Sequence, residues 1–391
     1  MGSCFRMKHT IPSIFEEKKM KRRFFLHTIG AGLSTIGLSS LEMRAGNGKN
    51  EFVNATESIL SKTPSSGSDI ISLLPPALKK GSTIGITAPA SGVDNGEIQE
   101  GIALLKASGY SIVLGNTLTR KFGYLSAPDS ERAAEFMEFV ERPDIDCILC
   151  ARGGYGVMRI LPMLDFSVIR ANPKIIIGYS DITALLVAIT KLSNVITYHG
   201  PVASSTFDSF TVDYFKKALC KPYSEDNDIT AKNEDFVPIT FSDSRITTLT
   251  EGVAKGRLTG GNLSMIVATL GTPYEIDTKD SLLFLEDIAE EPYRIDRMLT
   301  QLWLAGKLQQ CSGIILGQFK NCEAKRIPGF EVSFSLQEVL QSRITSLGIP
   351  AVYGLPIGHV KSKMTIPLGV MAELNAAGKS FTIMEQPVAF T

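Results

Sequence analysis

A serine, a glutamate and two histidines are the residues of this sequence whose types and spacing could support nucleophilic catalysis. Ser180 stands in a Gly-Tyr-Ser-Asp turn, between a short apolar run at 174–177 and a segment at 181–192 with apolar residues at helical spacing. Such a strand-to-helix turn presents a hydroxyl and backbone N–H groups to a substrate. Serine is also a common helix cap, and Ile182 replaces the second glycine of Gly-x-Ser-x-Gly, so the turn alone favours a cap.

A serine nucleophile needs a base within hydrogen-bond reach and an acid that orients the base. The chain has four histidines. Two of them, His9 and His27, lie in the N-terminal segment 1–72, which we do not expect to belong to the folded domains. The other two are His199, before a Gly-Pro pair at an expected strand end, and His359, in a loop of glycine and proline. Composition does not choose between them, and each could be a structural histidine.

Glu286 is the candidate acid. It follows four large apolar residues at the end of an expected strand. A charge so close to a core is costly without a partner. We expect a histidine as that partner, with an arginine such as Arg297 as the structural alternative.

Arg152 is the cation best placed to bind a free carboxylate, because it precedes a Gly-Gly-Tyr-Gly turn at another expected strand end. An internal salt bridge to Asp181 or Asp165 is the competing interpretation, and the sequence does not decide between them.

No metal or cofactor is expected. Two histidines cannot build a three-histidine zinc site, and the sequence has no compact Cys/His cluster and no His-Glu-x-x-His string. Cys147 and Cys150 form Cys-x-x-Cys within an expected strand, where their side chains would point to opposite faces. We interpret them as buried thiols.

These residues require a scaffold of alternating strands and helices. Strand-like and amphipathic segments alternate between residues 82 and 181, which predicts βαβ units and a largely parallel sheet. Ligands of such sheets bind beyond the carboxyl ends of the strands, where the loops at 88–92, 152–156 and 178–181 should converge. A polar, irregular stretch at 224–244 indicates a connection to a second domain.

The N-terminus predicts export. Lys-Arg-Arg-Phe-Phe-Leu at 21–26 precedes an apolar run at 28–38, a pattern typical of a twin-arginine signal and too short to span a bilayer. We assign 1–45 to the signal and 46–72 to a flexible tether, and expect a periplasmic or otherwise exported protein without a membrane span in the mature chain. A cytoplasmic protein with a basic, apolar N-terminus is the alternative.

Overall charge excludes one class of partner. Basic and acidic residues number 40 each, so no global field favours nucleic acid. The 44% hydrophobic content is typical of a globular protein.

Seven strings, in order and at sensible spacing, resemble the LD-carboxypeptidases and microcin immunity peptidases of serine peptidase family S66. The resemblance covers about 73–382 and rests on the strings at 151–156, 177–183, 199–201, 260–263, 283–287, 292–297 and 358–359. It implies an α/β fold with an N-terminal parallel-sheet domain of Rossmann or flavodoxin type at 73–230, and a C-terminal mixed α/β or β-rich domain at 231–391. The active site would lie at the domain interface.

The resemblance also implies residue roles. Ser180 would be the nucleophile, Glu286 the acid and His359 the base, which leaves His199 a supporting or substrate-lining role. For the oxyanion hole we expect the backbone N–H groups of Asp181 and of Gly153 or Gly154. Asn262 is expected to line the substrate pocket.

The expected function is a serine LD-carboxypeptidase that releases a terminal D-amino acid, D-alanine, from a murein tetrapeptide through an acyl-enzyme. The family implies a homodimer. Two alternatives stay open: a hydrolase of peptidyl or aminoacyl nucleotides, like the immunity peptidases, and a murein-peptide binding protein without catalysis.

Overall fold

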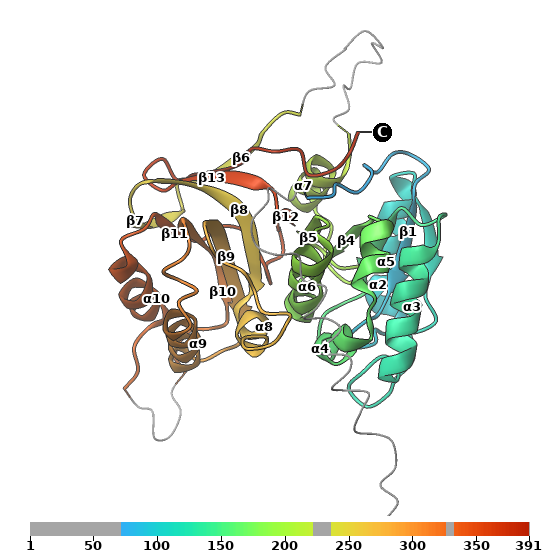
Figure 1. Cartoon of the computed structure of the whole chain (residues 1–391), viewed down its shortest axis with the longest axis horizontal. Helices are drawn as coiled ribbons and strands as arrows, with labels where there is room; N and C mark the ends of the chain where they lie inside the picture. The colour runs from blue at the N-terminus through green and yellow to red at the C-terminus, as the bar shows by residue number, and fades with distance from the viewer. Residues whose placement is uncertain (1–71, 222–235, 326–331, 391) are drawn as a thin grey trace, which may run out of the picture. The chain divides into compact units, whose positions relative to one another are not determined.

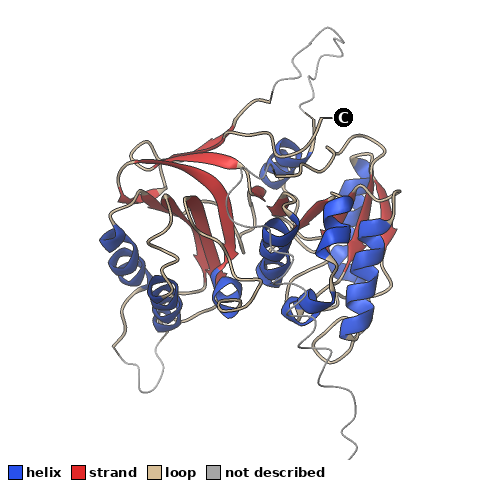
Figure 2. Ribbon diagram, in the orientation of Figure 1, coloured by secondary structure: helices blue, strands red, loops and turns tan. Residues whose placement is uncertain are grey.

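The computed structural model describes residues 72–221, 236–325 and 332–390, whose strands form two sheets (Figures 1 and 2). The predicted export signal at 1–45 and nearly all of the predicted tether at 46–72 lie outside the described residues, as does the predicted domain boundary at 230–231. Within those three ranges, no helix has both the length and the apolar character needed to cross a membrane.

The first sheet has six strands in the order β12-β5-β4-β3-β1-β2. Five of them run parallel, and they are β1 (Thr83–Thr87), β2 (Ser111–Leu114), β3 (Cys147–Cys150), β4 (Ile175–Gly178) and β5 (Thr197–His199). Every residue of β3 and β4 is buried, as expected of apolar strands that are covered on both faces.

A sixth strand comes from much later in the chain. Strand β12 (Ile366–Leu368) pairs antiparallel with β5, so a segment expected within the C-terminal domain completes the first sheet. Pro367 lacks a backbone N–H, which suits an edge strand that has a neighbour on one side only.

The helices around the first sheet follow the predicted alternation. They are α2 (Asn95–Ala107), α3 (Asp129–Glu141), α4 (Val157–Ile160), α5 (Phe166–Ala171), α6 (Thr183–Ser193) and α7 (Ser209–Leu219). Helices α3, α5 and α6 pack side by side (Figure 1). Pro128 occupies the cap position of α3, and the Asp129 side chain pairs with Arg132 and Arg159.

The second sheet has eight strands in the order β6-β14-β13-β8-β9-β10-β11-β7. Its parallel centre consists of β8 (Val253–Asn262), β9 (Ser281–Ile288), β10 (Gly313–Lys320) and β11 (Ala351–Tyr353). Antiparallel strands flank it, namely β6 (Ile239–Ser242), β7 (Thr247–Thr250), β13 (Met371–Asn375) and β14 (Ser380–Ile383). The predicted α/β fold, with a parallel sheet and a mixed one, is therefore confirmed.

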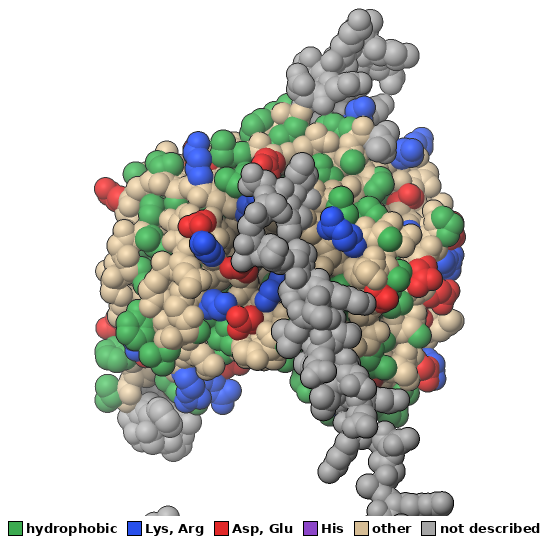
Figure 3. Space-filling model, viewed as in Figure 1, with side chains coloured by type: hydrophobic (Ala, Val, Ile, Leu, Met, Phe, Trp, Pro, Cys, Tyr) green, Lys and Arg blue, Asp and Glu red, His purple; other side chains and the backbone are tan. Residues whose placement is uncertain are grey.

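Three helices accompany the second sheet: α8 (Leu263–Ala268), α9 (Pro292–Leu304) and α10 (Leu336–Ile344). Helix α9 contacts both α8 and α10 (Figure 2). Acidic and basic side chains are interspersed over the face of the molecule drawn in Figure 3, in keeping with the balanced composition.

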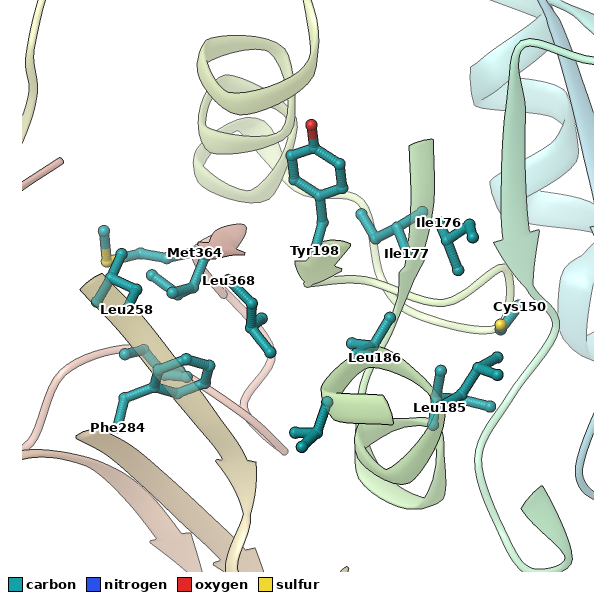
Figure 4. Packing of buried hydrophobic residues seen from close by; sticks show 14 of the residues in the cluster. Cys150, Ile176, Ile177, Leu185, Leu186, Tyr198, Leu258, Phe284, Met364 and Leu368 are labelled. Carbon is teal, nitrogen blue, oxygen red and sulfur yellow. The ribbon is translucent and has the colours of Figure 1, made fainter. Parts of the chain in front are cut away.

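One hydrophobic core serves both sheets. Helix α6 contacts β4 and β5 of the first sheet and also β8 and α8 beside the second. Figure 4 shows a part of this core, with Phe284 of β9, Leu368 of β12 and Leu186 of α6 in a single buried cluster. Because the packing is continuous, the ends of β4 and β9 are held in a fixed relation to each other.

Candidate active site

The turn after β4 holds Ser180 in a backbone conformation that residues with a side chain rarely adopt. Its φ is +64°, in the left-handed region, which costs free energy and is common at catalytic turns. A Cβ added at Gly178 would lie 2.8 Å from Cγ2 of Ile182, so the turn keeps its first glycine because Ile182 packs against it. The cap positions of the short 3₁₀ turn Ser180–Ile182 and of α6 are occupied by Tyr179 and Ile182, not by Ser180. The capping interpretation is therefore wrong.

The loop after β3 lies against this serine. A Cβ added at Gly153 would be 3.0 Å from Oγ of Ser180 and 3.2 Å from the amide nitrogen of Asp181. Gly154 has a φ of +103°, and a Cβ there would clash with Ser91. The Ser91 hydroxyl accepts a hydrogen bond from the Tyr155 amide, which fixes the loop. The three residues expected to form an oxyanion hole are thus brought to the same place as the serine.

Glu286, two residues before the end of β9, is fully buried and contacts His359 directly. Its Oε2 lies 2.7 Å from Nδ1 of the imidazole, whose side chain is 13% exposed. Gly358 has a φ of +93°, and a Cβ there would clash with the carboxylate. The partner of Glu286 is thus a histidine and not Arg297, whose guanidinium lies 5.4 Å from the centre of the Tyr293 ring.

The charge of Glu286 is stabilised in place. Burial disfavours the ionised carboxylate, but the imidazoles of His199 and His359 outweigh that cost and lower the pKa of Glu286 to about 2. Nδ2 of Asn262 donates to the other carboxylate oxygen, Oε1, at 3.3 Å. The acid is therefore ionised at any pH at which the protein would work.

His199 and Asn262 lie behind this carboxylate and are 1% and 4% exposed. Nε2 of His199 is 3.7 Å from Oε1 of Glu286, and within the described parts of the chain neither ring nitrogen has a hydrogen-bond partner. Asn262 also caps α8 by accepting from the Met265 amide. Such burial does not fit the substrate contacts expected of these two residues, but it fits a role in supporting the acid.

Two contacts join the serine turn to the acid and base. The ring of Tyr179, the residue before Ser180, packs edge-on against the His359 ring, with 4.8 Å between centroids. The backbone N–H of Asn262 donates to Oγ1 of Thr183, three residues after the serine, at 3.0 Å. The imidazole therefore lies beside the Ser180 turn, although the described contacts include no hydrogen bond between Ser180 and His359. Catalytic hydrogen bonds are often long without substrate and shorten when it binds.

Arg152 pairs with Glu97 of α2 at 3.3 Å, and both side chains are 41% exposed. The carboxylates considered as its partners bind elsewhere: that of Asp181 accepts from the Val157 amide, and that of Asp165 accepts from the first amides of α5. The internal salt bridges proposed from the sequence are therefore replaced by a pair at the surface.

Beside that pair is a hollow of about 190 Å³. Side chains of both charges and one aromatic ring line it, among them Ser91, Asp94, Glu97, Lys121, Tyr124 and Arg152. Because Ser91 also touches the Gly154 loop, the hollow is next to the serine turn. Its mixed charge could accommodate both the ammonium and the carboxylate groups of a peptide.

Lys363 is a residue of this site that sequence reasoning missed. It is 4% exposed, and its ammonium group lies 4.7 Å from the centre of the Tyr179 ring. Burial lowers the pKa of Lys363 to about 8. The available signal was its position, four residues after His359.

Within the described ranges, no group of three His, Cys, Asp or Glu side chains is placed to hold a metal ion. Cys147 and Cys150 are buried in β3, and both thiols are free. Burial raises the pKa of the Cys150 thiol, which makes it a poor nucleophile.

Comparisons with known proteins match both halves of the chain. The family model for the LD-carboxypeptidase N-terminal domain matches residues 84–200, and the model for the LD-carboxypeptidase C-terminal domain matches residues 255–374. The chain is 42% identical over 310 residues to the probable murein peptide carboxypeptidase of Bacillus subtilis, a match that covers 79% of this chain and 93% of that protein.

Two further relatives differ in their described roles. The murein tetrapeptide carboxypeptidase of Pseudomonas aeruginosa is 29% identical over 294 residues, covering 74% of this chain and 92% of that protein. A solved apo structure of the microcin C7 self-immunity protein MccF, a protein known from Escherichia coli, superposes with a TM-score of 0.70 at 29% identity. That superposition covers 81% of this chain and all of the other.

Proposed function

Because the chain belongs to the LD-carboxypeptidase family, peptidase family S66, we propose that it is a serine carboxypeptidase that removes the terminal D-amino acid of a murein tetrapeptide. The observation that carries the proposal is the 2.7 Å contact between Glu286 and His359 beside the Ser180 turn. Homologues named for murein peptides support the substrate class. D-alanine as the leaving group and the acyl-enzyme are parts of the proposal.

Acylation would use the three residues in sequence. Glu286 accepts a hydrogen bond from Nδ1–H of His359, which leaves the unprotonated Nε2 free to take the proton of the Ser180 hydroxyl. The serine oxygen attacks the carbonyl carbon of the scissile bond, and the imidazolium then gives its proton to the leaving amine. Water repeats the sequence on the resulting ester and releases the shortened peptide.

The negative oxygen of the tetrahedral intermediate needs preorganised donors. We assign this role to the amides of Asp181 and Gly153, since a Cβ built at Gly153 would approach both Oγ of Ser180 and the amide nitrogen of Asp181. One such donor contributes about 3 kcal/mol of transition-state stabilisation in other serine peptidases. Gly154, whose positive φ shapes the loop, would position the Gly153 amide.

An exopeptidase must also bind a free carboxylate, and we assign that task to Arg152. Its present partner, Glu97, is equally exposed, so exchanging this contact for a substrate carboxylate should cost little. The neighbouring hollow would take the charged groups of the peptide. Asn262 and His199 would hold the acid in place.

A second candidate function has one observation in its favour. Tyr124 and Tyr155 are 67% and 51% exposed, and their rings form an edge-on pair 5.3 Å apart. Tyr124 lines the hollow, where a flat ring could stack on a nucleobase. A peptidyl or aminoacyl nucleotide, as for a microcin immunity protein, is therefore the alternative substrate. Trp303, on α9, is not among the residues that line this hollow.

The deciding assay compares three substrates by mass spectrometry. We expect D-alanine to be released from a murein tetrapeptide, and no release from the same peptide ending in L-alanine. Cleavage of a peptidyl nucleotide alone would replace the first proposal with the second. Tight binding of the tetrapeptide without any turnover would identify the chain as a binding protein.

Export and dimerisation remain predictions. The twin-arginine string at 21–26 leads us to propose an exported enzyme, which would meet murein or its soluble fragments outside the inner membrane. Fractionation of cells that produce the chain, compared with a variant in which Arg22 and Arg23 are both replaced by lysine, tests this. Light scattering tests for the homodimer.

A further inference from the structure

Lys363 is a buried cation that the mechanism above does not use. Its side chain is 4% exposed, and none of the ion pairs among the described residues involves it. The ammonium group has a 3.5 Å contact with Oγ of Ser205, and the backbone amide donates to Oγ1 of Thr211. Burying a charge without a counterion at bonding distance is costly, so such a residue is a candidate for function.

Tyr179 connects this cation to the base. One contact of its ring is with Nζ of Lys363, 4.7 Å from the ring centre, and another is with the His359 ring, 4.8 Å between centroids. The ammonium group is therefore within about 10 Å of the imidazole, across buried protein where salt screens weakly. A cation against an aromatic face also holds that ring in place.

The other charged groups that face Lys363 come from three elements. Glu286 on β9 and Asp208 at the start of α7 favour its charge, and Lys320 at the end of β10 opposes it. The pKa of about 8 that results leaves the ammonium group charged over the whole range in which an ordinary imidazole titrates. Asp208 is itself engaged by the Ser362 hydroxyl and by the Thr211 amide.

We propose that Lys363 is a positioning residue that opposes protonation of His359 in the free enzyme, against the Glu286 carboxylate 2.7 Å from the imidazole, which favours it, and thereby extends activity toward acidic pH. A neighbouring positive charge disfavours the imidazolium, so His359 stays available to accept the serine proton at lower pH. In the transition state the imidazolium is accompanied by an oxyanion of opposite charge. The charge of Lys363 therefore changes the protonation of His359 in the free enzyme more than it changes the rate of the chemical step. This inference rests on the proposed role of His359 as the base.

The kinetic test compares the wild type with Lys363→Met, which keeps the length of the side chain and removes the charge, and with Lys363→Arg, which keeps the charge. The pH midpoint of the acid limb of kcat/KM should rise by about one unit in the Met variant, as expected for one charge at this distance in a medium of intermediate dielectric. It should stay near the wild-type value in the Arg variant. Lower rates with an unmoved midpoint would mean that Lys363 only packs, and would overturn the proposal.

An NMR titration separates this proposal from the proposed function. The His359 signal, assigned by its loss in His359→Asn, can be followed with pH whether or not a murein peptide is a substrate. A higher titration midpoint in Lys363→Met supports the proposal, and an equal midpoint overturns it. If Lys363→Met does not fold, Lys363→Gln gives the same neutral comparison and retains a polar group near Ser205. Absence of turnover on murein peptides would refute the proposed function alone.

Discussion

The two sides of the site handle charge in opposite ways. Around the hollow, Arg152 with Glu97 and Lys121 with Asp94 form pairs in which every side chain is 41% exposed or more. Behind the base, Glu286 is fully buried and is held by two imidazoles and an amide. Exposed pairs exchange partners at little cost, whereas a buried carboxylate fixes its surroundings. We infer that substrate binding is adaptable here and that the reacting groups are preorganised.

The largest expected effect follows removal of the nucleophile. Ser180→Ala should lower kcat by about 10⁵-fold or more, because a serine peptidase without its serine retains only the contribution of binding and the oxyanion hole. D-alanine release measures it. The thermal midpoint should not fall, since Ser180 holds no cap position and alanine adds no bulk. More than a few per cent of residual activity would show that another residue is the nucleophile.

Next in size is the loss of the buried charge. Glu286→Gln should lower kcat by roughly 10⁴-fold, because an amide in place of the acid favours the wrong imidazole tautomer. Asp287→Asn is the matched control, since Asp287 is the next residue of the same strand, is also buried and accepts hydrogen bonds from Ser264 and Asn262 instead of contacting His359. Equal losses in the two variants would point to a general structural effect on β9.

The same carboxylate makes stability depend on pH. Folding lowers the pKa of Glu286 from its usual 4.5 to about 2, so its contribution is complete above pH 4.5 and disappears as the pH falls toward 2. A shift of this size corresponds to about 3 kcal/mol of unfolding free energy. Urea unfolding at several pH values should therefore show a steeper loss of stability between pH 4.5 and 2 in the wild type than in Glu286→Gln. Parallel curves would contradict the depressed pKa.

The smallest expected effect on activity follows a change at Arg152, on the exposed side of the site. Arg152→Ala should raise KM by about 10-fold or more for a peptide with a free carboxylate, and change stability by less than about 1 kcal/mol. A neutral ester substrate should be affected far less. Arg159→Ala, which removes an exposed arginine paired with Asp129 on α3, is the control for loss of a surface charge. If both substrates suffered equally, Arg152 would be structural, and the contrast between the two sides would weaken.

The sequence was informative where a local pattern determines local structure. The apolar run before Ser180 and the strand that carries Glu286 were predictable, because buried strands leave a clear signature and a carboxylate beside a core needs a partner. The choice of His359 over His199 came from family resemblance, and the direct contact with Glu286 is consistent with it.

Other features depend on contacts between distant segments, which one sequence does not reveal. Strand β12 has three residues, including a proline, and pairs with a strand more than 160 residues earlier in the chain. The burial of Asn262 and Lys363 depends on how the two sheets pack, although both residue types are usually exposed. Arg152 found its partner on α2, whereas the sequence reasoning considered only aspartates near its own loop and the serine turn.

The short strand β12 has a consequence for access to the site. Seven residues after His359, Ile366 of β12 is the register partner of His199 on β5, and His199 is in turn the partner of Gly178, just before the Ser180 turn. The segment after His359 is therefore part of the same sheet as the strand that leads into the Ser180 turn. A hinge motion that separated the two sheets would break the pairing of β12 with β5. We therefore expect a peptide to enter the site past the surface loops.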